Sequence, residues 1–148
     1  MKDAAELFLN YLNGNATEAA SLFAADGYVE VPFTRSIGQQ PKYCGPTEIN
    51  NFMIFLHNEL YPNFTFKDIQ IHIADSTQAF ATYVIEARSA ISGKMLREEL
   101  FGHLVAADGK IKSLREAVDN LVAAEAIFPG GLEDVLAQRR QVAATAQP

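Results

Sequence analysis

The sequence predicts an α+β fold in which helices come first and an antiparallel sheet follows. Residues 3–60 mostly carry the spacing of amphipathic helices, whereas residues 64–118 form four strand-like runs joined by short turns. Helices that precede such a meander, instead of alternating with its strands, are typical of the α+β class. We therefore expect a cone-shaped, curved antiparallel sheet, wrapped by three N-terminal helices and enclosing a pocket, with a helical tail at the C-terminus.

The boundaries of these elements follow from caps, turns and periodicity. Asn15 or Thr17 can cap the second helix, and Gly14 suits the left-handed stop that ends the first. Turns are expected at Asp75-Ser76, Ser92-Gly93 and Asp108-Gly109. The expected elements are helices over 3–13, 17–25 and 46–60, strands over 28–33, 64–74, 78–91, 95–107 and 110–118, and further helical segments from 120 and over 132–144.

These elements suggest one domain and a short extension. Residues 1–128 form the α+β unit, and residues 129–148, which begin at Pro129-Gly130-Gly131, form a helical extension that is partly flexible. The formal net charge of −6 and the lack of a Lys/Arg cluster argue against a nucleic-acid partner. No signal peptide or membrane span is visible in the sequence, so a cytoplasmic protein with no membrane partner is expected.

The last hairpin carries the most informative polar residue. Leu114, Glu116 and Val118 share one face of the final strand because side chains alternate along a strand, and two of the three are apolar. Glu116 is therefore expected to point inward, where burial would raise its pKa and suit it to acid/base catalysis. The alternative is a structural ion pair with Arg97 or Arg115.

Other polar side chains could share that cavity. Alternation groups His103 with Phe101 and Val105, and Glu86 with Arg88, although a satisfied core histidine or a plain ion pair would explain these residues equally well.

Tyr28 and Glu30 share a face of the first strand and could also point inward, or Tyr28 could be plain core. His57 on the third helix would reach either the cavity wall or the solvent, and His72 is expected to be exposed. The three His share no metal-ligand spacing with carboxylates, so no metal site is expected.

A set of short motifs resembles the nuclear-transport-factor-2-like fold (the ketosteroid-isomerase-like superfamily), in its SnoaL-like branch, over residues 3–128. The resemblance implies the cone fold, which hosts isomerases, dehydratases, cyclases, epoxide hydrolases and non-catalytic binders. The motifs are Leu12-Asn13-Gly14-Asn15, Leu22-Phe23-Ala24-Ala25-Asp26-Gly27, Tyr28-Val29-Glu30-Val31-Pro32, Gly45-Pro46-Thr47-Glu48-Ile49, Phe101-Gly102-His103-Leu104, Gly109-Lys110-Ile111 and Leu114-Arg115-Glu116.

The catalytic positions of ketosteroid isomerases are apolar in this chain. The general-base Asp of those enzymes stands immediately before the Pro of the first strand, and that position is Val31 here. Their oxyanion-hole Tyr falls on Phe8, and their oxyanion-hole Asp falls near Phe101. The resemblance therefore disfavours steroid isomerisation, and it leaves Phe8 and Phe101 as expected walls of the substrate cavity together with Leu114 and Val118.

Two other groups of the superfamily share an acidic residue at Glu116. The resemblance to limonene-epoxide-hydrolase-like proteins implies an acid there, an Arg–acid pair that corresponds in reversed order to Glu86 and Arg88, and a Tyr that corresponds to Tyr28. The phenazine-biosynthesis A/B group resembles the last hairpin and implies Glu116 as the acid/base, with His57 as a candidate companion.

We therefore expect a SnoaL-like enzyme that acts without metal or cofactor on a small apolar or aromatic molecule. Glu116 would be the acid/base, helped by Tyr28, Arg88 and His103, in an isomerisation, cyclisation, dehydration or epoxide opening. The alternative is a non-catalytic hydrophobic-ligand-binding or accessory protein of the same fold.

A homodimer is expected through the outer face of the sheet. The superfamily often dimerises in this way, and large exposed apolar patches are unusual in monomers. The residues expected on that face are Tyr83, Ile85, Leu96, Leu100 and Leu104.

Overall fold

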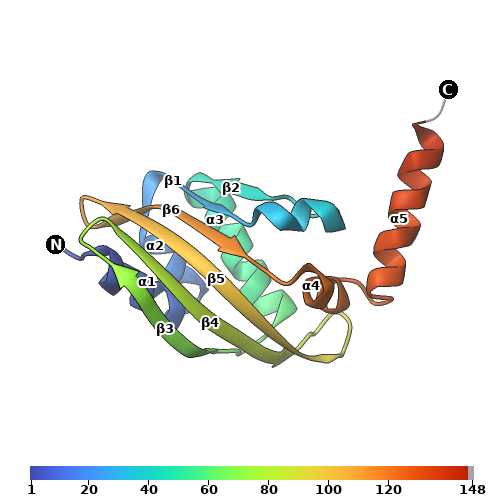
Figure 1. Ribbon diagram of the computed structural model, residues 1–148, viewed down its shortest axis with the longest axis horizontal. Coiled ribbons are helices and arrows are strands. Elements are labelled where there is room, and N and C mark those ends of the chain that lie inside the picture. Colours follow the sequence, from blue (N-terminus) through green and yellow to red (C-terminus); the bar gives the residue numbers. More distant parts are fainter. Residues whose placement is uncertain (147–148) are drawn as a thin grey trace.

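The computed structural model describes residues 1–146 and consists of a curved six-stranded sheet with the first helices on one of its faces (Figure 1). The strands follow one another in space in the order β2-β1-β6-β5-β4-β3. The elements are α1 (Ala4–Asn13), α2 (Ala16–Ser21), β1 (Phe23–Glu30), a 3₁₀ helix (Pro32–Ile37), β2 (Lys42–Cys44), α3 (Gly45–Ile54), a π-helical turn (Phe55–Leu60), β3 (Phe66–Ala74), β4 (Gln78–Arg88), β5 (Met95–Ala107), β6 (Lys110–Ala117), α4 (Asn120–Ile127) and α5 (Leu132–Thr145).

Short polar motifs begin the first two helices. The Asp3 side chain accepts a hydrogen bond from the backbone N–H of Glu6, and the Glu6 carboxylate accepts one from the backbone N–H of Asp3. Asn15 and Glu18 repeat this capping box at α2. These caps fix where α1 and α2 begin, and α1 then buries its apolar stripe against the sheet.

The predicted meander is confirmed for β3 to β6, whose neighbouring strands are all antiparallel. The sheet as a whole is mixed, because β1 runs parallel to β6 and antiparallel to the short edge strand β2. The sequence did not indicate β2 or the 3₁₀ helix, since a three-residue strand is too short to show alternation. Strand β1 also begins five residues earlier than Tyr28.

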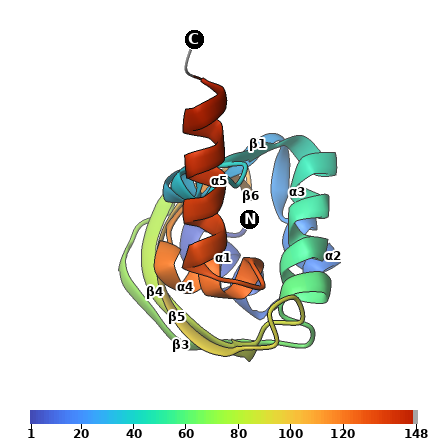
Figure 2. The ribbon, with the colours of Figure 1, turned by 90° about the vertical axis from the view of Figure 1, so that its right-hand side faces the viewer.

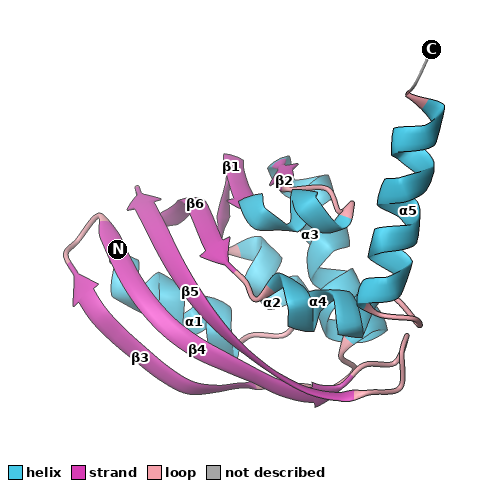
Figure 3. Cartoon of the chain, turned by 45° about the vertical axis from the view of Figure 1, so that its right-hand side comes forward, coloured by secondary structure: helices cyan, strands magenta, loops and turns pink. Residues whose placement is uncertain are grey.

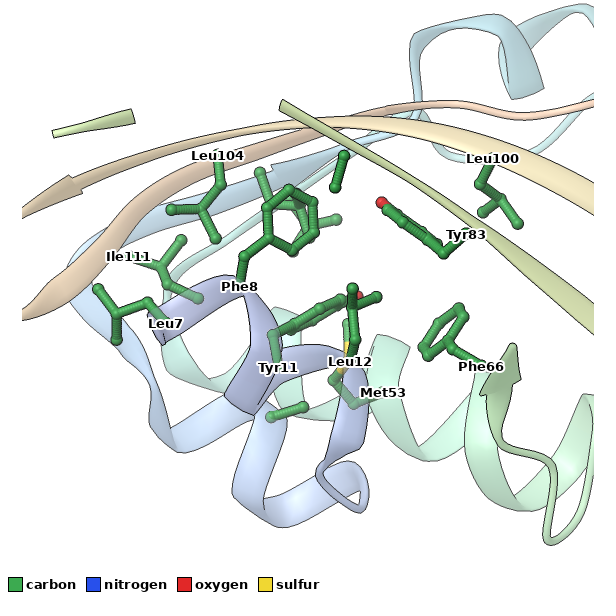
Figure 4. Close-up of a cluster of buried hydrophobic side chains, with 14 of the residues drawn as sticks. Leu7, Phe8, Tyr11, Leu12, Met53, Phe66, Tyr83, Leu100, Leu104 and Ile111 are labelled. Carbon is green, nitrogen blue, oxygen red and sulfur yellow. The ribbon is translucent and has the colours of Figure 1, made fainter. Parts of the chain in front are cut away.

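One face of the sheet is covered by the helices, and the residues that point to it decide where a site can lie. On β4 these residues include Ala81, Tyr83 and Ile85, and on β5 they include Leu100 and Leu104, all of which are buried. Figure 4 shows Tyr83, Leu100 and Leu104 facing labelled side chains of α1 and Met53 of α3. Figure 3 shows the same arrangement as a layer, with the curved strands on one side and the helices on the other.

The predicted outer face was therefore wrong for β4 and β5. Tyr83, Ile85, Leu100 and Leu104 lie in the core, and half-buried Leu96 packs against it. A shift of one residue reverses every side chain of a strand, so the choice of face depends on which face is more apolar. The true outer face includes the apolar residues Phe80, Val84, Phe101 and Val105, and this made the alternation ambiguous.

Helix α5 projects away from the rest of the protein (Figure 1). Val135 is its buried residue, and the Arg139 guanidinium donates two hydrogen bonds to the carbonyl oxygen of Ser36, at 3.0 and 2.6 Å. Within residues 1–146, no helix is long and apolar enough to span a membrane.

Candidate functional site

A mainly apolar cavity of about 80 Å³ lies between the inner face of the sheet and the helices. Figure 2 shows the sheet curving opposite α3, with α4 near the end of the space between them. This volume exceeds the roughly 10–15 Å³ that one water molecule needs. The lining residues are Val31, Thr34, Gln39, Tyr43, Phe52, Phe55, Leu56, Leu60, Tyr61, Phe66, Ile85, Glu98, Leu100, Glu116, Val118, Ala123 and Ile127.

Glu116 points into this cavity from β6, as the alternation of its strand predicts. Its side chain is buried, and its Oε2 accepts a hydrogen bond of 2.6 Å from the hydroxyl of Tyr83. Residue 102 stands opposite Glu116 on β5 and is a glycine. A β-carbon there would collide with the Tyr83 hydroxyl and the Phe8 ring, so the glycine leaves the space in which the two side chains meet.

Burial raises the pKa of Glu116 to about 7, although the hydrogen bond from Tyr83 acts in the opposite direction. The predicted alternative, an ion pair with Arg97 or Arg115, does not form. Arg115 pairs with Glu30 at 2.7 Å, and Arg97 lies 3.6 and 3.7 Å from Asp68 and Glu86. The carboxyl group of Glu116 is thus held by a neutral hydroxyl donor and not by a cation.

Tyr83 is fixed by aromatic neighbours as well as by Glu116. Its ring packs edge-on against Phe8 and Phe66, with centroids 5.6 and 5.3 Å apart (Figure 4). Burial and the nearby Glu116 charge raise the pKa of the Tyr83 phenol well above its usual range, so Tyr83 remains a donor. The hydroxyl of Tyr11 is also buried nearby, and it has no hydrogen-bond partner among the described residues.

A second carboxylate, Glu98, lines the same cavity and was missed in the sequence. It is only 6% exposed, and its pKa rises to about 8, first through burial and then through the charges of Glu116 and Asp119. The backbone N–H of Asp119 opposes this rise. The sequence does contain a sign of this position, because Glu98 shares a strand face with Leu96, Leu100 and Leu104. That face is predicted to lie on the outside of the sheet, so the predicted site does not include Glu98.

The remaining predicted site residues are divided between the core and the outer surface. Val118 lines the cavity as expected. Leu114 and Phe8 are fully buried in the core and do not line the cavity. His57 is half-buried on the π-helical turn, where its ring stacks on Phe64 at 4.9 Å and burial lowers its pKa. His57 likewise does not line the cavity.

Three of the four predicted catalytic residues lie on the outer face of the sheet and do not line the cavity, so that prediction was wrong for them. His103 Nε2 lies 2.9 Å from Gln78 Oε1, and Arg88 donates to the carbonyl of Gly93 at 2.7 Å. The ring of Tyr28 lies beneath the Lys42 ammonium, at 4.0 Å.

The predicted substrate-binding residues Glu30, Glu86 and Phe101 also lie on the outer side. Glu30 pairs with Arg115, Glu86 lies near Lys67 and Arg97, and Phe101 is 49% exposed. Glu86 and Phe101 lie outside because the faces of β4 and β5 are the reverse of those predicted. Glu30 lies outside because the register of β1 places it opposite Arg115 on β6. His72 is exposed, as expected, and its Nε2 lies 2.7 Å from Thr82 Oγ1.

Comparisons with solved structures identify the fold. A phenazine biosynthesis-related protein (PhzB2) of Pseudomonas aeruginosa is similar over 84% of this chain and 80% of its own, at 17% identity and a TM-score of 0.72. A Pseudomonas putida protein proposed to be a polyketide cyclase is similar over 86% of this chain and 99% of its own, at 18% identity and a TM-score of 0.69. The chain has the nuclear-transport-factor-2-like fold. A Burkholderia xenovorans LB400 protein described as nuclear-transport-factor-2-like is similar over 82% of this chain and 90% of its own, at 15% identity and a TM-score of 0.64.

Sequence comparisons add nothing to this fold assignment. No protein-family model matches the chain, and no curated protein matches it. Within residues 1–146, no group of three or more His, Cys, Asp and Glu side chains is placed to hold a metal ion.

The contact between Tyr83 and Glu116 predicts a measurable change in titration. Tyr83→Phe removes the donor that favours ionised Glu116 while keeping the ring, so the pKa of Glu116 is expected to rise above its value of about 7. Carbon-13 NMR titration of the Glu side chains would measure this. Tyr28→Phe, on the outer face, is the matched control, and an unchanged Glu116 pKa in Tyr83→Phe would contradict the assignment.

Proposed function

We propose that the protein is a small-molecule enzyme that uses Glu116 for cofactor-independent acid/base chemistry on an apolar or aromatic substrate. The observation that supports this most directly is the buried carboxyl of Glu116, which lines an apolar cavity and is oriented by the Tyr83 hydroxyl. A carboxyl group with a pKa of about 7 is present in both protonation states near neutral pH. It can therefore take a proton and return one.

The proposed reaction is a proton transfer at carbon next to a carbonyl or enone group. Ionised Glu116 would take the proton, the electron pair of the broken C–H bond would move into the enolate, and the protonated carboxyl would return the proton at another carbon. The donor from Tyr83 would keep the carboxyl group oriented between the two steps. Isomerisation follows directly from this sequence, whereas cyclisation, dehydration and epoxide opening need the same carboxyl as acid or base.

The names of similar structures agree with this class of chemistry. One similar structure is related to phenazine biosynthesis, and another is proposed to be a polyketide cyclase. The aromatic and aliphatic lining of the cavity, with rings at Phe52, Phe55, Tyr61 and Phe66, suits a substrate with a large apolar surface.

A second candidate function is binding without catalysis. It is favoured by the positions of Arg88 and His103, because neither lies at the cavity to stabilise a developing oxyanion. In that case the cavity would hold an apolar ligand, or the protein would be an accessory subunit.

The acid/base proposal predicts that Glu116→Gln keeps the fold and abolishes proton transfer. Apolar enones and aromatic ketones in D₂O provide a general assay, since NMR detects exchange or rearrangement at carbon. Loss of the base is expected to lower the rate by at least about 10²-fold, the lower end of the contribution of general acid–base catalysis.

Glu99→Gln is the matched control, because Glu99 is exposed and lies on the outer face of β5. It should leave the rate unchanged. Equal rates in wild type and Glu116→Gln, for a compound whose conversion is protein-dependent, would disprove the assignment. Tight binding without any conversion would favour the binding function.

We also propose that two copies associate through the outer face of the sheet. This face exposes Ile73 at 74% and Phe101 at 49%, and Phe101 packs edge-on against Phe80 at 6.2 Å. Large apolar side chains clustered on a sheet face favour a self-complementary contact.

Sedimentation equilibrium tests this association. Wild type is expected to be dimeric at micromolar concentration, and Phe101→Glu is expected to shift it to monomer because it places a charge in the interface. Phe33→Glu, at a similarly exposed Phe away from the sheet, should remain dimeric. A monomeric wild type would contradict the proposal.

A further inference from the structure

The ionisable side chains of the cavity can supply negative charge but no positive charge. Among the described residues that line it, Glu98 and Glu116 carry the ionisable carboxyl groups, and no Lys, Arg or His lines it. Its remaining polar side chains, on Thr34, Gln39 and the two Tyr, are neutral donors and acceptors. An anionic ligand would find no cation there, and a charged group without a partner is costly to bury.

Glu98 differs from Glu116 in having no side-chain partner. Glu116 receives the Tyr83 hydroxyl, whereas no side chain of the described region forms a hydrogen bond or ion pair with Glu98. The backbone N–H of Asp119 favours its ionised form, and the charges of Glu116 and Asp119 both oppose its ionisation. A buried carboxyl that lines a cavity and has no cationic or side-chain partner is suited to a cation supplied by a ligand.

Aromatic side chains line the same cavity as this carboxyl group. Tyr61 lines the cavity with Glu98, and the pKa of its phenol is raised by burial and by the charge of Glu98. Tyr43 and Phe52, which also line the cavity, stack with centroids 4.3 Å apart. Aromatic faces attract organic cations through their quadrupoles, and the attraction is stronger in a desolvated site.

We propose that this cavity binds a small organic cation, an alkylated ammonium group carried on an apolar body, with Glu98 as its counter-ion and the aromatic wall around it. The proposal rests on the proposed function in using the same cavity, and it specifies the substrate class as cationic. Glu116 would remain free for proton transfer. Glu98 thus serves recognition, and Glu116 serves chemistry.

The binding of a cation would ionise Glu98. With a pKa of about 8, Glu98 is mostly protonated at neutral pH, and an adjacent ammonium would favour the charged form. The bound state would then hold fewer protons than the free state, so the affinity for a permanently charged ligand must rise with pH through the pKa of Glu98. A neutral ligand that accepts a hydrogen bond from protonated Glu98 would show the opposite dependence.

Three molecules of nearly equal shape test the proposal: choline, 3,3-dimethylbutan-1-ol and 3,3-dimethylbutanoate, which are cationic, neutral and anionic. Isothermal titration calorimetry on the full chain is expected to show binding of choline in preference to the other two. From a pKa of about 8, choline affinity should rise about tenfold between about pH 7 and about pH 9. At about pH 7, binding should release up to one proton, detected from the dependence of the heat on the buffer.

Glu98→Gln should lose both the preference for choline and the proton release, whereas Glu99→Gln should keep them. Equal affinity for choline and its neutral isostere, preference for the carboxylate, or no binding of choline would overturn the proposal. Unchanged selectivity in a folded Glu98→Gln would also overturn it. Because these measurements require no turnover, their failure leaves the role of Glu116 untouched, and failure of the Glu116→Gln assay leaves the cation site untouched.

Discussion

The arrangement of the whole site depends on the burial of two carboxyl groups without a cation beside them. Glu116 and Glu98 point to the covered face of the sheet, where burial disfavours their charged forms. A rise in the pKa of Glu116 from 4.5 to about 7 corresponds to about 3 kcal/mol of folding free energy at neutral pH. A fold that keeps such a group does so at a measurable loss of stability, which a purely structural role for Glu116 does not explain.

The surrounding core is built in a way that maintains this arrangement. Helix α1 places Phe8 against the Tyr83 ring, and Phe66 holds the ring from β3. The missing side chain at Gly102 opens the space in which the Tyr83 hydroxyl reaches Glu116. The carboxyl group is therefore fixed by packing from three separate parts of the chain, which is a form of preorganisation that acid/base chemistry requires.

The order of the elements and the position of Glu116 could be predicted from the sequence, but most of the companions of Glu116 could not. Long periodic segments and capping residues mark the helices and strands, and the apolar neighbours Leu114 and Val118 fix the face of β6. The faces of β4 and β5 were ambiguous because both sides carry apolar residues. That single ambiguity moved Tyr83 and Glu98 out of the predicted site and moved Arg88 and His103 into it. A register error of one residue is enough to produce all four mistakes.

The pH dependence of folding stability tests the uncompensated burial of both carboxyl groups most directly. The free energy of unfolding of wild type and of the double variant Glu98→Gln/Glu116→Gln would be measured by urea denaturation across the acidic to mildly alkaline range. Both pKa values are raised by folding, so the protonated folded state is favoured at low pH and the advantage is lost as pH rises from 4.5 to about 8. Relative to the variant, wild type is predicted to lose at least about 3 kcal/mol over that interval. Parallel curves for the two proteins would contradict the account.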